Sequence, residues 1–171
     1  MKHLILKCLK VLFFFLIFNA CQSNSSGSSA ECSKGEPTPV FSSDFDFVKS
    51  HQFSKEHQRS TENILFSDSL KLTIRQSGCE KVRQEYEFVL AGSKGIETDS
   101  TWVGRSAELF SQLSRYEEKF YSFNQWANKI NQHKSEIKLT EAFEVAPNVY
   151  IQIDRIRDPQ ATLLQVVLFE K

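Results

Sequence analysis

The sequence predicts an α+β fold in which an antiparallel sheet of about five strands carries one long or two shorter helices on one face. Two neighbouring segments alternate apolar and polar residues, a longer segment repeats apolar residues at helical spacing, and three further strand-like segments follow it. Strands joined by short turns pair antiparallel, and an amphipathic helix covers one face of their sheet. The chain contains no internal repeat.

The first two alternating segments predict a β-hairpin. Residues 70–74 and 82–90 both show the period of two that is typical of a half-buried strand, and residues 76–80 between them are rich in turn-forming types. Glu85 and Glu87 share the face opposite the apolar residues. We interpret them as part of a solvated outer face rather than as an acid–base pair.

A helical segment follows the hairpin. Residues 93–100 are predicted to form a loop, and the hydroxyl residues at its end can cap a helix. Over residues 101–131, apolar side chains return at spacings of three, four and seven. The segment forms one long helix or two shorter helices that separate near residues 121–122.

The remaining strands are predicted at residues 137–145, 149–156 and 163–169, with proline-containing turns between them. The segment before the hairpin, residues 31–60, is polar with scattered phenylalanines, and two prolines near its start argue against a helix there. We expect an irregular lead-in that lays aromatic side chains onto the core.

The N-terminus has the parts of a secretory signal peptide. Three lysines and no acid precede an apolar run of eight residues at positions 11–18, and a small residue, Ala20, follows. As a helix the run is about 12 Å long, whereas a bilayer core requires about 20 residues. This run is therefore too short to cross a membrane.

The end of this segment, Phe18-Asn19-Ala20-Cys21, resembles the lipobox of bacterial lipoproteins. Ala20 and Cys21 match the pattern, while Phe18 and Asn19 depart from it as in looser lipoboxes. The resemblance implies that residues 1–20 are removed and that Cys21 carries a diacylglyceryl thioether. Its acyl chains would hold the protein outside the cytoplasm, on the outer membrane or on the outer leaflet of the inner membrane. Ordinary cleavage and free secretion are the alternative.

The rest of the chain divides into a tether and one domain. Residues 22–30 are small and polar, and a flexible chain of this length reaches roughly 15–18 Å. Residues 21–30 thus form the lipidated cysteine with its tether, and residues 31–171 form a single α+β domain. The chain has 21 basic and 21 acidic residues, and loss of three lysines with the signal leaves a net charge of −3. This balance argues against a nucleic-acid partner.

Cysteine usage predicts one disulfide. Of the four cysteines, Cys8 leaves with the signal and Cys21 is acylated, so Cys32 and Cys79 remain in an oxidising compartment. A bridge between them closes a loop of about 48 residues and stabilises the fold by roughly 4 kcal/mol in the chain-entropy model. A reactive thiol or a zinc site is disfavoured, because neither a helix start nor a CxxC spacing accompanies them.

The chain has no recognisable catalytic or metal-binding motif. His51 and His57 lie six residues apart in the lead-in, which is not the spacing of a helical metal pair. Ser135 and Lys138 match a Ser-x-x-Lys spacing, but they begin a predicted strand and lack the companion motifs of acyl enzymes. We therefore expect no enzymatic activity, no cofactor and no metal.

An aromatic cluster on the predicted helix is the most suggestive functional feature. Phe120 and Phe123 are assigned to the core, which leaves Tyr116, Tyr121 and Trp126 as a possible interaction face. Core packing with incidental exposure is the alternative interpretation of these three residues. We expect a membrane-anchored, non-enzymatic protein-interaction module of the cell envelope. Small-ligand or glycan binding between sheet and helix is the alternative, and an envelope hydrolase is less expected.

Overall fold

A computed structural model describes residues 36–78, 80–91, 98–157 and 161–171 of the chain. Every described element belongs to one compact unit, Cys32–Lys171.

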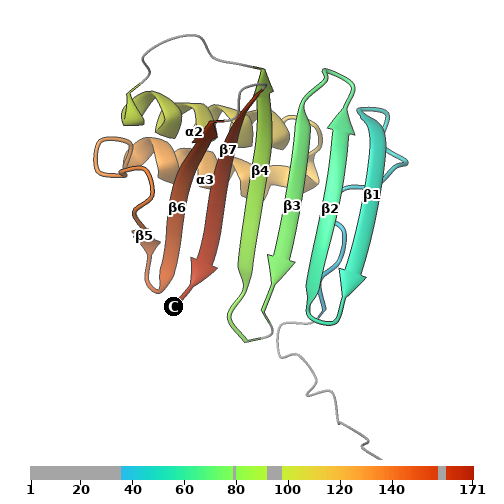
Figure 1. The fold of residues 1–171 in the computed structure, drawn as a ribbon, viewed down its shortest axis with the longest axis horizontal. Coiled ribbons are helices and arrows are strands. Elements are labelled where there is room, and N and C mark those ends of the chain that lie inside the picture. The colour runs from blue at the N-terminus through green and yellow to red at the C-terminus, as the bar shows by residue number, and fades with distance from the viewer. Residues whose placement is uncertain (1–35, 79, 92–97, 158–160) are drawn as a thin grey trace, which may run out of the picture. The chain divides into compact units, whose positions relative to one another are not determined.

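The described part of this unit is a two-layer α+β domain (Figure 1). Its elements are β1 (Val48–Glu56), β2 (Arg59–Phe66), β3 (Lys71–Ser77), β4 (Arg83–Ala91), α2 (Asp99–Ser114), the 3-10 helix η1 (Glu118–Phe120), α3 (Tyr121–Gln132), β5 (Phe143–Ala146), β6 (Val149–Arg157) and β7 (Ala161–Glu170). All seven strands form one sheet in the order β1-β2-β3-β4-β7-β6-β5, and every neighbouring pair is antiparallel. The α2 and α3 helices lie on one face of this sheet (Figure 1).

The antiparallel sheet covered by helices on one face is confirmed, but the number of strands was underestimated. The predicted hairpin corresponds to β3 and β4, and the last two predicted strands correspond to β6 and β7. The two extra strands, β1 and β2, begin inside the segment expected to be irregular. Two of the four inward positions of β2 are the polar Ser60 and Glu62, so the apolar alternation that marks a strand is missing there.

Two boundaries also differ from the predictions. The helical segment is two helices, and the break between them covers residues 115–120, just before the predicted position. The strand expected at residues 137–145 is replaced by turns, with a short β5 at Phe143–Ala146. Ile137 is buried without being in a strand, and Thr140 takes a positive φ of 69°. An apolar residue that packs from a turn explains why the pattern was mistaken for a strand.

The helix-side layer is completed by residues 36–47, which we call the strap. Phe41 of the strap is buried, and its ring centroid lies 5.2 Å from that of Phe66 on β2 and 4.7 Å from that of Phe120. Phe45 and Phe47 extend this aromatic cluster, with a stacked centroid distance of 5.0 Å. The expectation that the lead-in lays aromatic residues onto the core is therefore confirmed.

A buried carboxylate attaches the strap to the sheet. Glu62 of β2 is 0% exposed, and its carboxylate accepts hydrogen bonds from the backbone N–H groups of Val40 and Phe41, both at 2.8 Å. The Nε2 atom of His51 on β1 lies 2.9 Å from the same carboxylate. A buried ionised group is tolerated only when such bonds replace its hydration. Glu62 therefore binds the strap and β1 together.

Replacing Glu62 by glutamine tests this role. An amide offers a single acceptor oxygen, so at least one of the three groups around it loses its acceptor inside the core. We expect Glu62→Gln to lower the free energy of unfolding by about 2 kcal/mol, because an unsatisfied buried donor costs about that much. Urea unfolding measures the change. Glu141→Gln, at an exposed position, is the matched control. Equal stabilities of the two variants would contradict the anchoring role.

Candidate functional site

The sheet face opposite the helices, which we call the open face, has no second layer in the part of the chain that the structure describes (Figure 1). Because side chains alternate along a strand, the open face is built from every second residue of each strand. Register places four aliphatic residues in one row across the sheet, interrupted once by Lys71. We call Leu65, Val89, Leu163 and Ile156 the aliphatic row. Ile156 is 47% exposed, which is unusual for a large apolar side chain in this domain.

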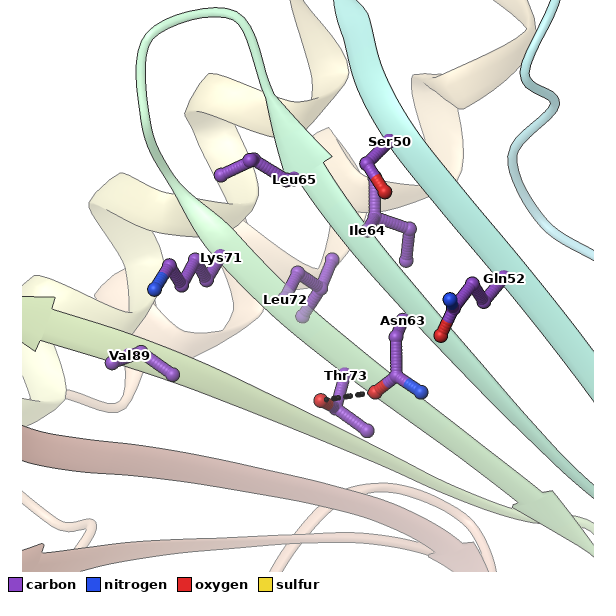
Figure 2. A pocket seen from close by; sticks show the side chains of 9 residues that line it. All are labelled: Ser50, Gln52, Asn63, Ile64, Leu65, Lys71, Leu72, Thr73 and Val89. Atoms are coloured by element: carbon purple, nitrogen blue, oxygen red, sulfur yellow. Dashed lines mark hydrogen bonds between the residues drawn. The ribbon is translucent and has the colours of Figure 1, made fainter.

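A polar row runs beside the aliphatic row. Its members, in strand order, are Gln52, Asn63, Thr73, Glu87, Gln165 and Asp154. The Thr73 hydroxyl donates to Asn63 Oδ1 at 2.9 Å, and Arg75 Nη1 lies 3.2 Å from a carboxylate oxygen of Glu87 (the first contact is drawn in Figure 2). These contacts hold Asn63, Thr73 and Glu87 in position beside the aliphatic row.

A hollow of about 270 Å³ lies where the two rows cross β1 to β4 (Figure 2). Its lining residues are Ser50, Gln52, Asn63, Ile64, Leu65, Lys71, Leu72, Thr73 and Val89. Hydroxyl and amide groups provide both donors and acceptors beside aliphatic carbon, and Lys71 has no ion-pair partner among the described residues. This chemistry suits a polypeptide surface, which presents amide groups and apolar side chains together.

A larger hollow of about 610 Å³ lies between α2, the β2–β3 turn and the end of β4. Its lining residues are Asp68, Ser69, Leu70, Val89, Leu90, Arg105, Glu108, Leu109 and Gln112. Asp68 accepts hydrogen bonds from Gln112 Nε2 at 2.6 Å and from the Tyr116 hydroxyl at 3.0 Å. The Asp68 carboxylate therefore joins the β2–β3 turn to the end of α2 and to Tyr116, which follows it.

The aromatic residues singled out from the sequence have different environments. Phe120 and Phe123 are buried, which confirms their assignment to the core. Tyr116 stacks on Phe47 and Phe66, with centroid distances of 4.5 and 4.9 Å, and Trp126 is half-buried against the core. Tyr121 is 61% exposed. Of the three proposed contact residues, Tyr121 alone presents most of its surface to solvent.

The residues predicted for lipidation and for the disulfide lie outside the described residues. Cys21, Cys32 and Cys79 are not among the described residues. His133 Nδ1 lies 3.1 Å from Glu136, and no group of three or more potential metal ligands occurs in the described part of the chain. None of the helices in that part is long and apolar enough to cross a bilayer.

Sequence reasoning did not single out the aliphatic row or Glu62. The row could have been found from the alternation in β4, where Val89 continues the outer face that Glu85 and Glu87 begin. Glu62 gave no such signal, because its strap partners precede it by about twenty residues in an irregular segment.

The fold and its surface thus define a class of two-layer α+β domain with a packed helix side and a mixed apolar and polar sheet face that no described residue covers with a second layer. No family model, no curated protein and no solved structure matches this chain. A functional proposal therefore depends on the residues of the chain itself.

The Tyr116–Asp68 contact makes stability sensitive to alkaline pH. Burial, the hydrogen bond to Asp68 and the charge of that carboxylate raise the pKa of Tyr116 from 10.0 to about 12. A phenol whose pKa is raised by folding stabilises the fold while it is neutral, and that contribution is lost as the pH rises from about 10 to 12. We expect the unfolding free energy of Tyr116→Phe to fall less over this range than that of the wild type. Urea unfolding at pH 8, 10 and 11.5 measures both slopes, and parallel curves would contradict the assignment.

Proposed function

We propose that the protein is a lipid-anchored, extracytoplasmic module of a bacterial cell envelope that binds another protein through its open face. The observation that supports this proposal most directly is the aliphatic row, which lies on a face that no described helix or strand covers and is bordered on one side by the polar row. Protein contact surfaces commonly have an apolar centre and a polar rim. The function is binding and involves no catalysis.

The open face is also organised before any partner binds. Val167 points to the open face yet is only 1% exposed, because the side chains around it on neighbouring strands shield it. Next to it, Arg83 Nη2 lies 2.9 Å from Glu85, which is itself within 4.0 Å of Arg75. Side chains that are already fixed lose little conformational entropy on binding. These fixed polar side chains of the open face therefore favour specific recognition of a protein surface.

The proposed anchor determines where the module acts. Acyl chains on Cys21 and the polar tether of residues 22–30 would keep the domain near one membrane surface. A partner held in or on the same membrane would then meet the open face at a high effective concentration. The anchor at Cys21 is inferred from the resemblance of residues 18–21 to a lipobox.

Small-ligand or glycan binding is the second candidate function. The observation that favours it is the hollow of about 610 Å³ between sheet and helix, a size within the usual range of about 300–1,000 Å³ for ligand sites. Leu90 and Leu109 supply apolar surface there, and Arg105 and Glu108 supply charges at the rim.

Photo-crosslinking in the native cells tests the protein-binding proposal. A photoreactive amino acid is placed at Leu163 in the aliphatic row or, for comparison, at Tyr121 on α3. We expect one dominant protein adduct from position 163, identified by mass spectrometry. The adduct should fall at least about tenfold when Cys21→Ala removes the anchor, because the effective concentration is lost.

The two positions distinguish the candidate surfaces. An adduct from Tyr121 and none from Leu163 would place the contact on the predicted interaction face of Tyr116, Tyr121 and Trp126. That result would overturn the open-face proposal. No adduct from either would favour the ligand site, and the native protein should then retain a small molecule by mass. A matched variant, Glu118→photoreactive residue at an exposed position of η1, reports non-specific labelling.

We also propose a disulfide between Cys32 and Cys79. The described neighbours of the two cysteines support it, because Glu36, Pro37 and Thr38 line one hollow of about 240 Å³ together with Ser77 and Gly78. Gly78 takes a φ of 100°, so the turn before Cys79 is tight. The four residue-to-residue steps from Cys32 to Glu36 span at most about 14 Å. The bridge would fasten the start of the strap to the β3–β4 turn.

Alkylation followed by intact mass measurement tests the bridge. We expect the purified native protein to take up no label at Cys32 or Cys79 before reduction and two labels after it. Reduction should lower the unfolding free energy by up to roughly 4 kcal/mol. Label on both thiols before reduction would exclude the disulfide.

A further inference from the structure

We propose that β1 pairs with β1 of a second copy of the chain, so that two seven-stranded sheets join into one continuous antiparallel sheet. This self-association uses the edge of the sheet and is independent of the partner that we propose for the open face. Four observations support it: an unpaired edge, a self-complementary register, balanced charges and a half-buried aromatic residue at the centre of the edge.

The two edges of the sheet differ in length and regularity. The β5 edge has four residues, an irregular register and Pro147 directly after it, which are features that prevent edge pairing. The β1 edge has nine residues and pairs regularly with β2 from Ser50 to Glu56. Within that stretch, no hydrogen bond among the described residues uses the backbone groups that point away from β2. A long, regular edge of this kind is suited to pair with another strand.

The sequence of β1 is complementary to itself in one register. A two-fold axis perpendicular to the sheet keeps every side chain on its own face, so each residue opposes one that lies an even number of positions away. When the axis passes through Phe53, the pairing includes every residue of the regular stretch from Ser50 to Glu56. It sets Ser50 opposite Glu56, His51 opposite Lys55, Gln52 opposite Ser54, and Phe53 opposite its own copy. On the open-face side, the opposing side chains are small or uncharged apart from Glu56.

The charges on the strap side of β1 are already balanced. His51 lies against the buried Glu62, and Lys55 forms an ion pair with Glu36 of the strap. Opposing His51 to Lys55 therefore adds no unpaired charge. Shifting the axis to Gln52 would set Lys49 opposite Lys55, and like charges directly opposite each other are destabilising. Charge thus favours the register centred on Phe53 over the register centred on Gln52.

Phe53 is the residue that gains most from this contact. It lies opposite Glu62 on the strap side of the sheet and is half-buried, whereas inward residues on β2 are fully buried. A second Phe53 across the axis would cover the remaining apolar surface, and aromatic residues that face each other across an antiparallel pair attract one another. An unrelated strand would supply such a ring only by coincidence, which is why a second copy is the occupant that the edge fits best.

Engineered cysteines test the register in the mature protein, purified in detergent from its own membrane. With Phe53→Cys, a disulfide should form between two copies, because residue 53 opposes itself across the axis. The two thiols release two protons, and a mild copper oxidant accepts the two electrons. Ser54→Cys is the matched control, since residue 54 opposes residue 52 and cannot bridge to its own copy. Mixing Ser54→Cys with Gln52→Cys should restore the crosslink. Oxidised wild type measures the background from the native cysteines.

Light scattering at increasing protein concentration gives a second, independent readout. We expect Phe53→Lys to raise the dissociation constant of the dimer at least about tenfold, because a lysine on an edge strand blocks pairing. Tyr121→Lys exchanges an exposed aromatic residue elsewhere in the same way and should leave the constant unchanged. A monomer at every concentration, or equal crosslinking at positions 53 and 54, would overturn the proposal. Either result would leave the open-face proposal unaffected, since that surface is tested at Leu163.

Discussion

The buried Glu62 carboxylate is the interaction on which the rest of the described domain depends. It is surrounded by two backbone N–H groups of the strap and by His51, so one side chain joins the strap, β1 and β2. Taking a carboxylate out of water is unfavourable unless all its partners are present at once. The strap therefore docks as a unit, and Phe41 is carried into the aromatic cluster with it. Without this attachment, the strap would no longer cover the helix side of β1 and β2.

The sequence predicted the fold class because most of the sheet obeys simple alternation. In β3 and β4 the buried inward residues are hydrophobic, so period and burial agree there, as Ile74 and Phe88 show. In β2 the inward series begins with Ser60 and Glu62, and their burial depends on partners in the strap. Local patterns cannot reveal a hydrogen bond made about twenty residues away, which is why two strands and the anchoring carboxylate were missed.

The environments of the predicted contact residues could not be derived from the sequence for a related reason. Tyrosines are common at interfaces, which is why Tyr116 is a candidate contact residue, but its ring packs against both Phe47 and Phe66 and its hydroxyl donates to Asp68. A sequence shows which residue types could bind a partner, whereas packing decides which of them remain available. Among the described residues, most aromatic side chains on the helix side pack into the core, and the exposed large hydrophobic residues are Tyr121 on α3 and Ile156 on the open face.

The two proposed contacts are physically compatible because they use different chemical groups. Open-face binding uses side chains that point away from the helices, whereas β1 pairing uses backbone groups in the plane of the sheet. The β1 pairing depends on the strap, because Phe53 lies opposite Glu62 in the β1–β2 register and Glu62 binds the strap. On these proposals, a change that releases the strap weakens the edge first, since β1 is held by β2 alone on its other side. The aliphatic row is centred on β4 and β7, away from that edge, so partner binding would outlast the dimer as the strap is destabilised.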